Sequence, residues 1–331
     1  MTEATSPAGS TGTTGVAPVL DPSSEALLRR LELAVRNKLD GLLHGNYLGL
    51  VPGAGSDNGE SRLYYAGDDV RRMDWPVTAR TGVPYVRQTV ADRELETWLA
   101  VDLSASLDFG TANSDKRELV LAALTALTQL TARDGNRVGA IVSTGAATRR
   151  IPALAGRGNA HQLVRAIARM PRAEPGQRGD LVSMLEQLRR PPRRRGLVVV
   201  VSDFLDSGAA SAPGPSPAPA MPPWARALRA LGGRHQLLAV EIVDPREMEL
   251  PAAGLMTFVD TETGAQVEVQ TARAEVRERF AAAAAAQRTA IADALRHAGA
   301  AHLQLRTDRN WVDDIVRFVL SRRHLLADAV I

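Results

Sequence analysis

The chain has 331 residues, of which 45% are hydrophobic, and it carries a formal net charge of +3 and no cysteine. This length allows one large domain or two ordinary ones with a substantial core. The near balance of acidic and basic residues argues against a dedicated nucleic-acid binder. Without cysteine, the chain has no disulfide, no thiolate zinc site and no cysteine nucleophile.

The first residues, 1–23, are rich in Thr, Ser, Gly and Pro, and this composition predicts a disordered tail. They contain neither the basic region nor the apolar core of a signal peptide. No stretch of the chain approaches the roughly 18 apolar residues that span a bilayer. We therefore expect a cytoplasmic protein with no integral membrane segment.

A smaller leading subdomain is expected over residues 24–94. It opens with apolar residues at helical spacing from Ser24 to about Leu43. Turn-rich sequence and short β-like pieces follow, including "PYVRQTV". Dense charge of both signs surrounds Trp75, and this segment is either a docking surface or a set of structural ion pairs, with a structural role favoured for Asp74, Trp75 and Arg80. The residues considered for partner binding are Asp68, Asp69, Arg71 and Arg72.

The main domain is expected over residues 95–325, where strand and helix patterns alternate. Three apolar runs, "TWLAVDL", "GLVVVVSD" and "HQLLAVEIVD", read as strands buried on both faces. "NRVGAIVST" and "ATRRIPA" read as an antiparallel hairpin at the edge of the sheet, and "LMTFVDTETGAQVEV" as a second hairpin. Helices are predicted over "DKRELVLAALTALTQLTARDG", "NAHQLVRAIARM" and "DLVSMLEQLRR", from about Thr271 to His297, and from about Asn310 to Arg323. The pattern predicts an α/β fold with a mostly parallel, Rossmann-like sheet and helices on both faces.

The stretch at 207–223, "SGAASAPGPSPAPAMPP", interrupts this pattern. Its Pro, Ala, Ser and Gly composition cannot build a core, so we expect a flexible surface insertion. It is either an interaction segment or a tolerated insertion, and the second reading is favoured.

Two of the buried strands end in aspartate, at Asp102 and at Asp203. Ligands of open parallel sheets bind beyond the carboxyl ends of the strands, so neighbouring strands would bring both carboxylates to one crevice. Ser104 and Ser106 follow Asp102 at alternate positions and can face the same way. Oxygen ligands without nitrogen or sulfur suit a hard cation, above all Mg²⁺. In the alternative to a metal site, these residues are helix caps and turn residues.

The sequence "DLSAS" resembles the DxSxS signature of the von Willebrand factor A domain, whose metal-ion-dependent adhesion site holds magnesium. "GDDVRRMDWPVTAR", "VVVVSDF" and "VEIVDPREMELP" together resemble the bacterial family catalogued as domain of unknown function 58. Members of that family are similar to A-type domains and commonly accompany MoxR-type AAA+ ATPases. The resemblance runs from about Leu43 to the C-terminus.

The resemblance implies a set of metal ligands. Asp102, Ser104 and Ser106 would be ligands from the first loop, and Asp203 would act through water. An A-type domain also supplies a threonine, but the corresponding turn "QRGDL" offers Gly179 beside Asp180. Either affinity for the ion is weakened or Asp180 substitutes with another geometry.

The expected function is a non-enzymatic protein-interaction module with a Mg²⁺ site whose open position takes a partner's carboxylate. The expected partner is a MoxR-type ATPase or a client that it remodels. A metal-free structural scaffold is the first alternative. A magnesium-dependent phosphoesterase is less favoured, because no histidine lies near either aspartate-ending strand to serve as a base. A haloacid-dehalogenase-type site is not favoured either, because Ser104 stands where its second aspartate should be.

Overall fold

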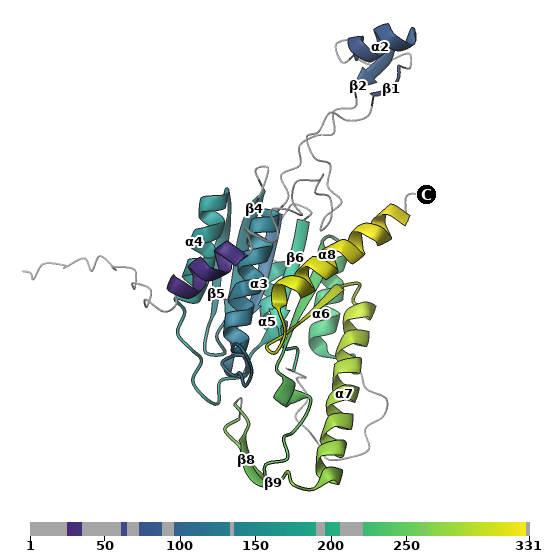
Figure 1. Ribbon diagram of the computed structural model, residues 1–331. Helices are drawn as coiled ribbons and strands as arrows, with labels where there is room; N and C mark the ends of the chain where they lie inside the picture. Colours follow the sequence, from purple (N-terminus) through teal and green to yellow (C-terminus); the bar gives the residue numbers. More distant parts are fainter. Residues whose placement is uncertain are drawn as a thin grey trace, which may run out of the picture.

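The structure is a computed structural model that describes residues 25–34, 61–64, 73–87, 96–132, 136–189, 196–205, 221–261 and 263–328. Its centre is a six-stranded sheet in the order β10-β7-β6-β3-β4-β5 (Figure 1). Neighbouring strands pair in parallel except at the edge, where β5 runs antiparallel to β4. The predicted mostly parallel α/β sheet and its edge hairpin are therefore confirmed. The strands are β3 Glu96–Asp102, β4 Arg137–Ser143, β5 Thr148–Ala155, β6 Gly196–Ser202, β7 Gln236–Val243 and β10 Ala301–Arg306.

Helices cover both faces of this sheet, each against its own apolar cluster. One face carries α3 (Lys116–Thr131), α4 (Arg157–Ala168), α8 (Trp311–Asp328) and the helical residues 25–34. The other face carries α5 (Leu181–Arg189), α6 (Pro223–Gly232) and α7 (Ala274–His297). None of the helices in these described ranges has the length and hydrophobicity that a membrane crossing requires.

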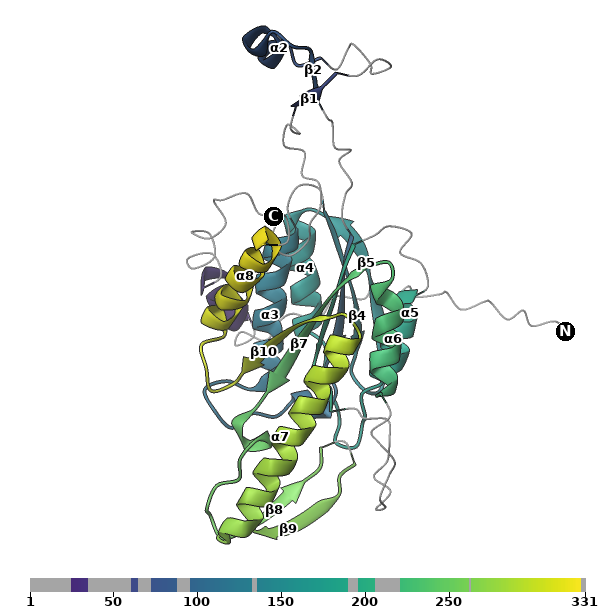
Figure 2. The ribbon, with the colours of Figure 1, turned by 90° about the vertical axis from the view of Figure 1, so that its right-hand side faces the viewer.

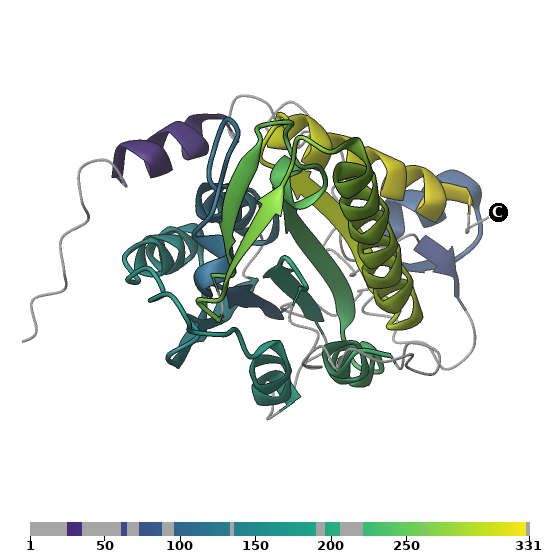
Figure 3. The ribbon, with the colours of Figure 1, turned by 90° about the horizontal axis from the view of Figure 1, so that it is seen from below.

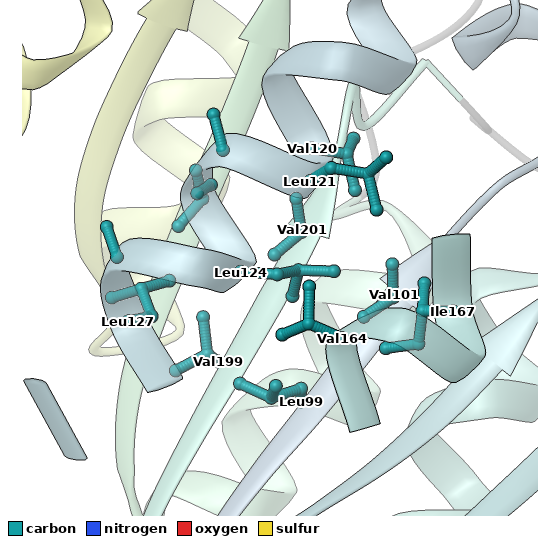
Figure 4. Close-up of a cluster of buried hydrophobic side chains, with 14 of the residues drawn as sticks. Leu99, Val101, Val120, Leu121, Leu124, Leu127, Val164, Ile167, Val199 and Val201 are labelled. Atoms are coloured by element: carbon teal, nitrogen blue, oxygen red, sulfur yellow. The ribbon is translucent and has the colours of Figure 1, made fainter. Parts of the chain in front are cut away.

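One apolar cluster fills the space between strands β3 and β6 and helices α3 and α4. Figure 4 shows leucine and valine side chains of the two strands meeting those of the two helices. Every residue of β6 is buried, as expected for a strand covered on both faces. Asp102, the last residue of β3, and Asp203, directly after β6, are thus carried by strands that are buried in the apolar core.

A hairpin of β8 (Leu255–Val259) and β9 (Gln266–Gln270) follows β7, as predicted. Figures 1 and 2 show it beyond the carboxyl ends of the parallel strands, beside the first half of α7. In Figure 3, which views this end of the molecule, the light-green hairpin crosses in front of the strand ends. A segment distant from β3 in sequence thus lies next to the edge where the candidate site was expected.

The leading segment forms a small unit of its own. Strands β1 (Ser61–Leu63) and β2 (Tyr85–Arg87) pair antiparallel, with helix α2 (Trp75–Thr81) between them in sequence. Figures 1 and 2 show this unit apart from the six-stranded sheet. The prediction named short β-like pieces in this segment and missed α2, which Asp74 caps by accepting a hydrogen bond from the Val77 amide.

The prediction missed a second helix, α6, whose first residue, Pro223, was assigned to the Pro-rich insertion. Pro at the first helical position does not oppose a helix, because the missing amide hydrogen has no partner there anyway. The rest of the proposed insertion, up to residue 220, and the proposed tail at 1–23 lie outside the described residues.

Candidate functional site at the carboxyl edge of the sheet

The two aspartate-ending strands are direct neighbours, since β3 and β6 pair in parallel. Asp102 is the last residue of β3, and Asp203 directly follows Ser202, the last residue of β6. All three side chains are buried. The carboxyl ends of parallel strands share one edge, so both carboxylates lie at the same edge of the sheet. This arrangement is the one expected from the sequence.

The loop after β3 folds its polar side chains around Asp102. The amide of Ser104 donates to Asp102 Oδ1 at 2.9 Å, and the hydroxyl of Ser202 donates to Asp102 Oδ2 at 3.0 Å. The hydroxyl oxygens of Ser104 and Ser106 lie 3.2 Å apart, and Ser106 also hydrogen-bonds to Asp203. The structure therefore brings together all four residues named as ligands of the first loop and the later strand.

Burial leaves Asp102 with a proton affinity unusual for an aspartate. Removal from water, and then the nearby charge of Asp203, raise its pKa from 3.8 to about 6. The hydrogen bonds from Ser104 and Ser202 act in the opposite direction without cancelling this effect. At neutral pH Asp102 is thus a buried carboxylate whose negative charge is only partly compensated. Such a group favours a positive ligand.

Gly179 completes the site from a third loop. A side-chain carbon at this position would lie 3.2 Å from both Asp102 Oδ1 and Ser104 Oγ. The bare glycine therefore lets the loop approach these two oxygens closely. The same loop is tied to the β8–β9 turn by a hydrogen bond from the Gly176 amide to the Thr261 carbonyl. The hairpin thus supports the loop that borders the site.

Asp180, the proposed substitute for the missing threonine, serves another purpose in the structure. Its Oδ1 accepts a hydrogen bond from the Ser183 amide at 2.8 Å, at the start of α5. The residue is exposed, whereas its neighbour Gly179 is buried. An aspartate before the first turn of a helix is a preferred cap. Asp180 is therefore placed as a cap of α5, and the glycine beside it faces Asp102.

Asp203 is held by a lysine that the sequence analysis did not single out. Lys116 Nζ donates to Asp203 Oδ2 at 2.9 Å and to the Ser106 carbonyl at 3.1 Å. Neither side chain is more than 2% exposed. Burial alone would raise the pKa of Asp203 and lower that of Lys116. Their mutual attraction outweighs it, so that Asp203 stays ionised and Lys116 stays protonated.

A second carboxylate, that of Glu247, also binds Lys116. Glu247 lies in a short 3-10 helix, Pro245–Glu247, and its Oε2 accepts a 2.8 Å hydrogen bond from Arg288. Arg288, on α7, further donates to the Asp203 carbonyl at 3.1 Å and to Glu241 at 2.9 Å. Buried charges are stable only when paired in this way. The network joins β6, α3 and α7 beneath the site.

The backbone conformation of the "DPRE" stretch, residues 244–247, is fixed by this network and by a capping box. Asp244 accepts hydrogen bonds from Arg246 and from the Thr111 amide, both at 2.9 Å, and its own amide donates to Glu247. The double contact between Asp244 and Glu247 fixes the turn after β7. The motif therefore acts at the same edge of the sheet as "DLSAS" and "SDF".

The turn after Asp203 stores backbone strain. Phe204 has φ 57°, in the left-handed region that residues other than glycine seldom adopt. Its amide donates to the hydroxyl of Ser202, and its ring lies 5.1 Å from that of Trp224 on α6. Such strain persists only where the surroundings determine it. The packing of α6 therefore helps to set the direction of Asp203.

The donor set fits a hard cation in part. Asp102, Ser104 and Ser106 supply oxygen only, and Gly179 leaves room that a side-chain carbon would fill. Asp203 does not fit the expected role, because Lys116 already satisfies it. Across the described residues, no three His, Cys, Asp or Glu side chains gather into a metal-binding group. A cation here would thus depend on one carboxylate and two hydroxyls.

The proposed partner-binding residues Asp68, Asp69, Arg71 and Arg72 lie outside the described residues. Of the charged segment around them, Asp74 is buried and has the structural role that was favoured for it. Trp75, for which a structural role was also favoured, is 65% exposed. Its ring is therefore not part of the core of the small unit.

Three site residues escaped the sequence reasoning: Ser202, Lys116 and Glu247. Ser202 directly precedes Asp203, so its place at the strand end was a signal that could have been used. Lys116 and Glu247 are 131 positions apart, and no spacing rule joins them. Glu247 does lie in a stretch that carried the family resemblance, which was the available hint.

Comparison with known proteins gives one family and several relatives. The model of the family "Protein of unknown function DUF58" matches residues 60–290. An uncharacterized protein of Mycobacterium bovis, Mb1516, is 54% identical over 92% of this chain and 91% of its own length. An uncharacterized protein of Mycobacterium tuberculosis, Rv1480, shows the same values. An uncharacterized protein of Mycobacterium avium is 48% identical over 53% of this chain and 94% of its own length.

Proposed function

The chain belongs to the DUF58 family, and we propose that it acts as a non-enzymatic protein-interaction module built on a von Willebrand factor A-like domain. The observation that carries the proposal is the gathering of Asp102, Ser104 and Ser106 beside Gly179, at the carboxyl edge of a mostly parallel sheet. Ligands of such sheets bind at this edge. The proposal places the protein in the cytoplasm.

A non-enzymatic role is supported by the state of the groups around the site. A hydrolase would need a general base beside the reacting atoms. Lys116 is protonated, and its ammonium group already donates to three oxygens, from Asp203, Glu247 and Ser106. Asp203 is ionised but engaged by that same ammonium. These residues hold charge in place and do not supply a free base.

Mg²⁺ is the proposed cofactor. Asp102, Ser104 and Ser106 would hold it, with Asp102 providing the charge and the two hydroxyls completing one side of the shell. When bound, the ion would act as a Lewis acid that accepts a carboxylate oxygen from a partner at its open position. Gly179 and its loop, held by the β8–β9 turn, would shape the approach of that carboxylate.

The proposed partner is a MoxR-type AAA+ ATPase or a client protein that it remodels, with assembly or remodelling of other proteins as the process. This part rests on the family resemblance. A metal-free structural scaffold is the second candidate, and the Lys116–Asp203 pair favours it, because an internal cation already neutralises one of the two aspartates. A phosphoesterase is the least supported reading, because among the described residues Asp203 and Lys116 are paired with each other, and Asp102, the carboxylate whose pKa would suit a base, would be occupied as a metal ligand.

The test is capture of partner proteins by the full chain, with Mg²⁺ and with a chelator, for wild type and Asp102→Ala. We expect a partner that is retained only with Mg²⁺ and lost with the variant. Asp180→Ala, which removes a helix cap at the same edge, is the matched control and should retain the partner. Equal capture under all conditions would rule out the metal-dependent site and favour the scaffold.

A further inference from the structure

Lys116 occupies a position that decides how a cation can bind at this edge. Its ammonium group is fully buried and donates to Asp203 Oδ2, to the Ser106 carbonyl and to Glu247. An ammonium has three protons and therefore three hydrogen bonds to give. All three hydrogen bonds are made within the site, so the donors of Lys116 are satisfied without any outside ligand.

The groups that bind Lys116 are themselves held by other residues. The lysine side chain therefore cannot easily adopt another position. Glu247 Oε2 binds Arg288 at 2.8 Å and also accepts from the Asp244 amide. The Asp203 carbonyl accepts from Arg288 at 3.1 Å, and Asp203 Oδ1 accepts from the Leu205 amide at 3.2 Å. Releasing Lys116 would leave the buried carboxylate of Asp203 without a cation and the half-buried Glu247 with Arg288 alone, which is costly. The lysine is therefore a fixed part of the site.

The fixed lysine limits the negative charge available to a metal ion. Of the two aspartates that converge here, Asp203 is neutralised by Lys116, and only Asp102 remains uncompensated. The affinity of a site for a hard divalent cation depends on the number of charged ligands. One carboxylate with two hydroxyls is a weak set, and a second carboxylate has to come from elsewhere.

We infer that Lys116 makes metal binding conditional on the partner: the chain alone holds Mg²⁺ weakly, and a partner's Asp or Glu carboxylate supplies the second negative charge. This inference rests on the proposed function, whose Mg²⁺ site it deepens. The metal and the acidic partner then bind cooperatively, each raising the affinity for the other by the same factor. Lys116 is a positioning residue here, since it acts through Asp203 and does not touch the ion.

The test frees the Asp203 carboxylate from its cation while keeping the net charge of the network unchanged. The double variant Lys116→Met with Glu247→Gln removes one positive and one negative group, and methionine replaces the apolar stem of the lysine. Affinity for Mg²⁺ alone is measured by titration calorimetry on the full chain after chelator treatment. Circular dichroism and melting curves check that each variant folds. Adding Asp203→Asn to the double variant gives the matched control.

We expect the double variant to bind Mg²⁺ at least about tenfold more tightly than wild type, and the control to return to the wild-type value. Equal affinity of wild type and double variant would overturn the inference while leaving a metal-dependent site intact. Absence of binding in both would overturn it as well. Whether the proposed function also fails is then decided by the Asp102→Ala capture experiment, which does not involve Lys116.

A single-residue experiment covers the case in which the double variant does not fold. If the pairing with Lys116 prevents Asp203 from being a metal ligand, Asp203→Asn in the wild-type background changes the affinity for Mg²⁺ by less than about twofold. In contrast, Asp102→Asn removes Mg²⁺ binding. A loss of similar size in both variants would show that Asp203 is a ligand and would overturn the inference.

Discussion

Lys116 Nζ lies 2.9 Å from Asp203 Oδ2, and this buried contact joins the first turn of α3 to the end of β6. It connects residues 87 positions apart. Breaking a buried pair on one side leaves an uncompensated charge, which usually costs more than the intact pair contributes. The contact is therefore both a structural tie and the feature that sets the charge of the candidate site.

Lys116→Met alone should lower the free energy of unfolding by roughly 3–5 kcal/mol, because Asp203 and Glu247 lose their shared cation. The double variant with Glu247→Gln should lose clearly less, since the network then carries one uncompensated negative charge fewer. Urea unfolding at neutral pH measures both. A single variant that is as stable as the double variant would contradict the account of this network.

The stability should depend on pH through Asp102. Its pKa in the folded protein, about 6, lies above the ordinary 3.8, so the folded state holds the proton more tightly than the unfolded state does. This contribution to stability is complete below about pH 4 and is lost as the pH rises through about 6. The loss amounts to at most about 3 kcal/mol.

Asp102→Asn isolates this effect, because asparagine stays neutral, its oxygen can still accept from the Ser104 amide, and its NH2 group can donate to the Ser202 hydroxyl oxygen instead of accepting from it. With a chelator present, we expect the variant to be more stable than wild type at pH 7.5 and close to it at pH 4. Chemical unfolding at several pH values gives the difference directly. A constant difference across the range would mean that Asp102 does not titrate as described.

Gly179→Ala should weaken Mg²⁺ binding and partner capture with little effect on folding. The added carbon would stand 3.2 Å from Asp102 Oδ1 and Ser104 Oγ, where it narrows the space beside both. Gly158→Ala, in α4, is the control, because the added carbon would meet no atom within 4 Å beyond its chain neighbours and the backbone of its own helix. That change should leave binding unchanged and stabilise the helix by up to about 1 kcal/mol. Unchanged binding in Gly179→Ala would remove this loop from the site.

Much of the sheet could be predicted because strands buried on both faces leave strong signals. A run such as "GLVVVVSD" predicts a strand that is buried on both faces. The polar residue at the end of the run marks the carboxyl end of that strand. The helix α2 was missed because seven residues carry too little periodicity, and its cap, Asp74, lay within a segment rich in charge. The helix α6 was hidden by the prolines before it.

The candidate site was predictable where its residues are close in sequence and unpredictable where they are not. Asp102, Ser104 and Ser106 follow one strand, and the pairing of β3 with β6 brought Asp203 to them as expected. The hold of Lys116 on Asp203 depends on where α3 begins relative to β6, which no local pattern records. The different roles of Asp180, which caps α5, and Gly179, which borders the site, became clear only once the start of α5 was known.

The measurement that tests the central claim most directly is the affinity of the full chain for a purified MoxR-type ATPase, compared between wild type and Asp102→Ala in the same magnesium buffer. Constant magnesium keeps the needs of the ATPase itself unchanged, so that only the site differs. We predict measurable binding by wild type and a loss of at least about tenfold with Asp102→Ala, while Asp180→Ala binds as wild type. Equal binding by all three proteins would contradict the claim that the carboxyl edge of the sheet recognises the partner.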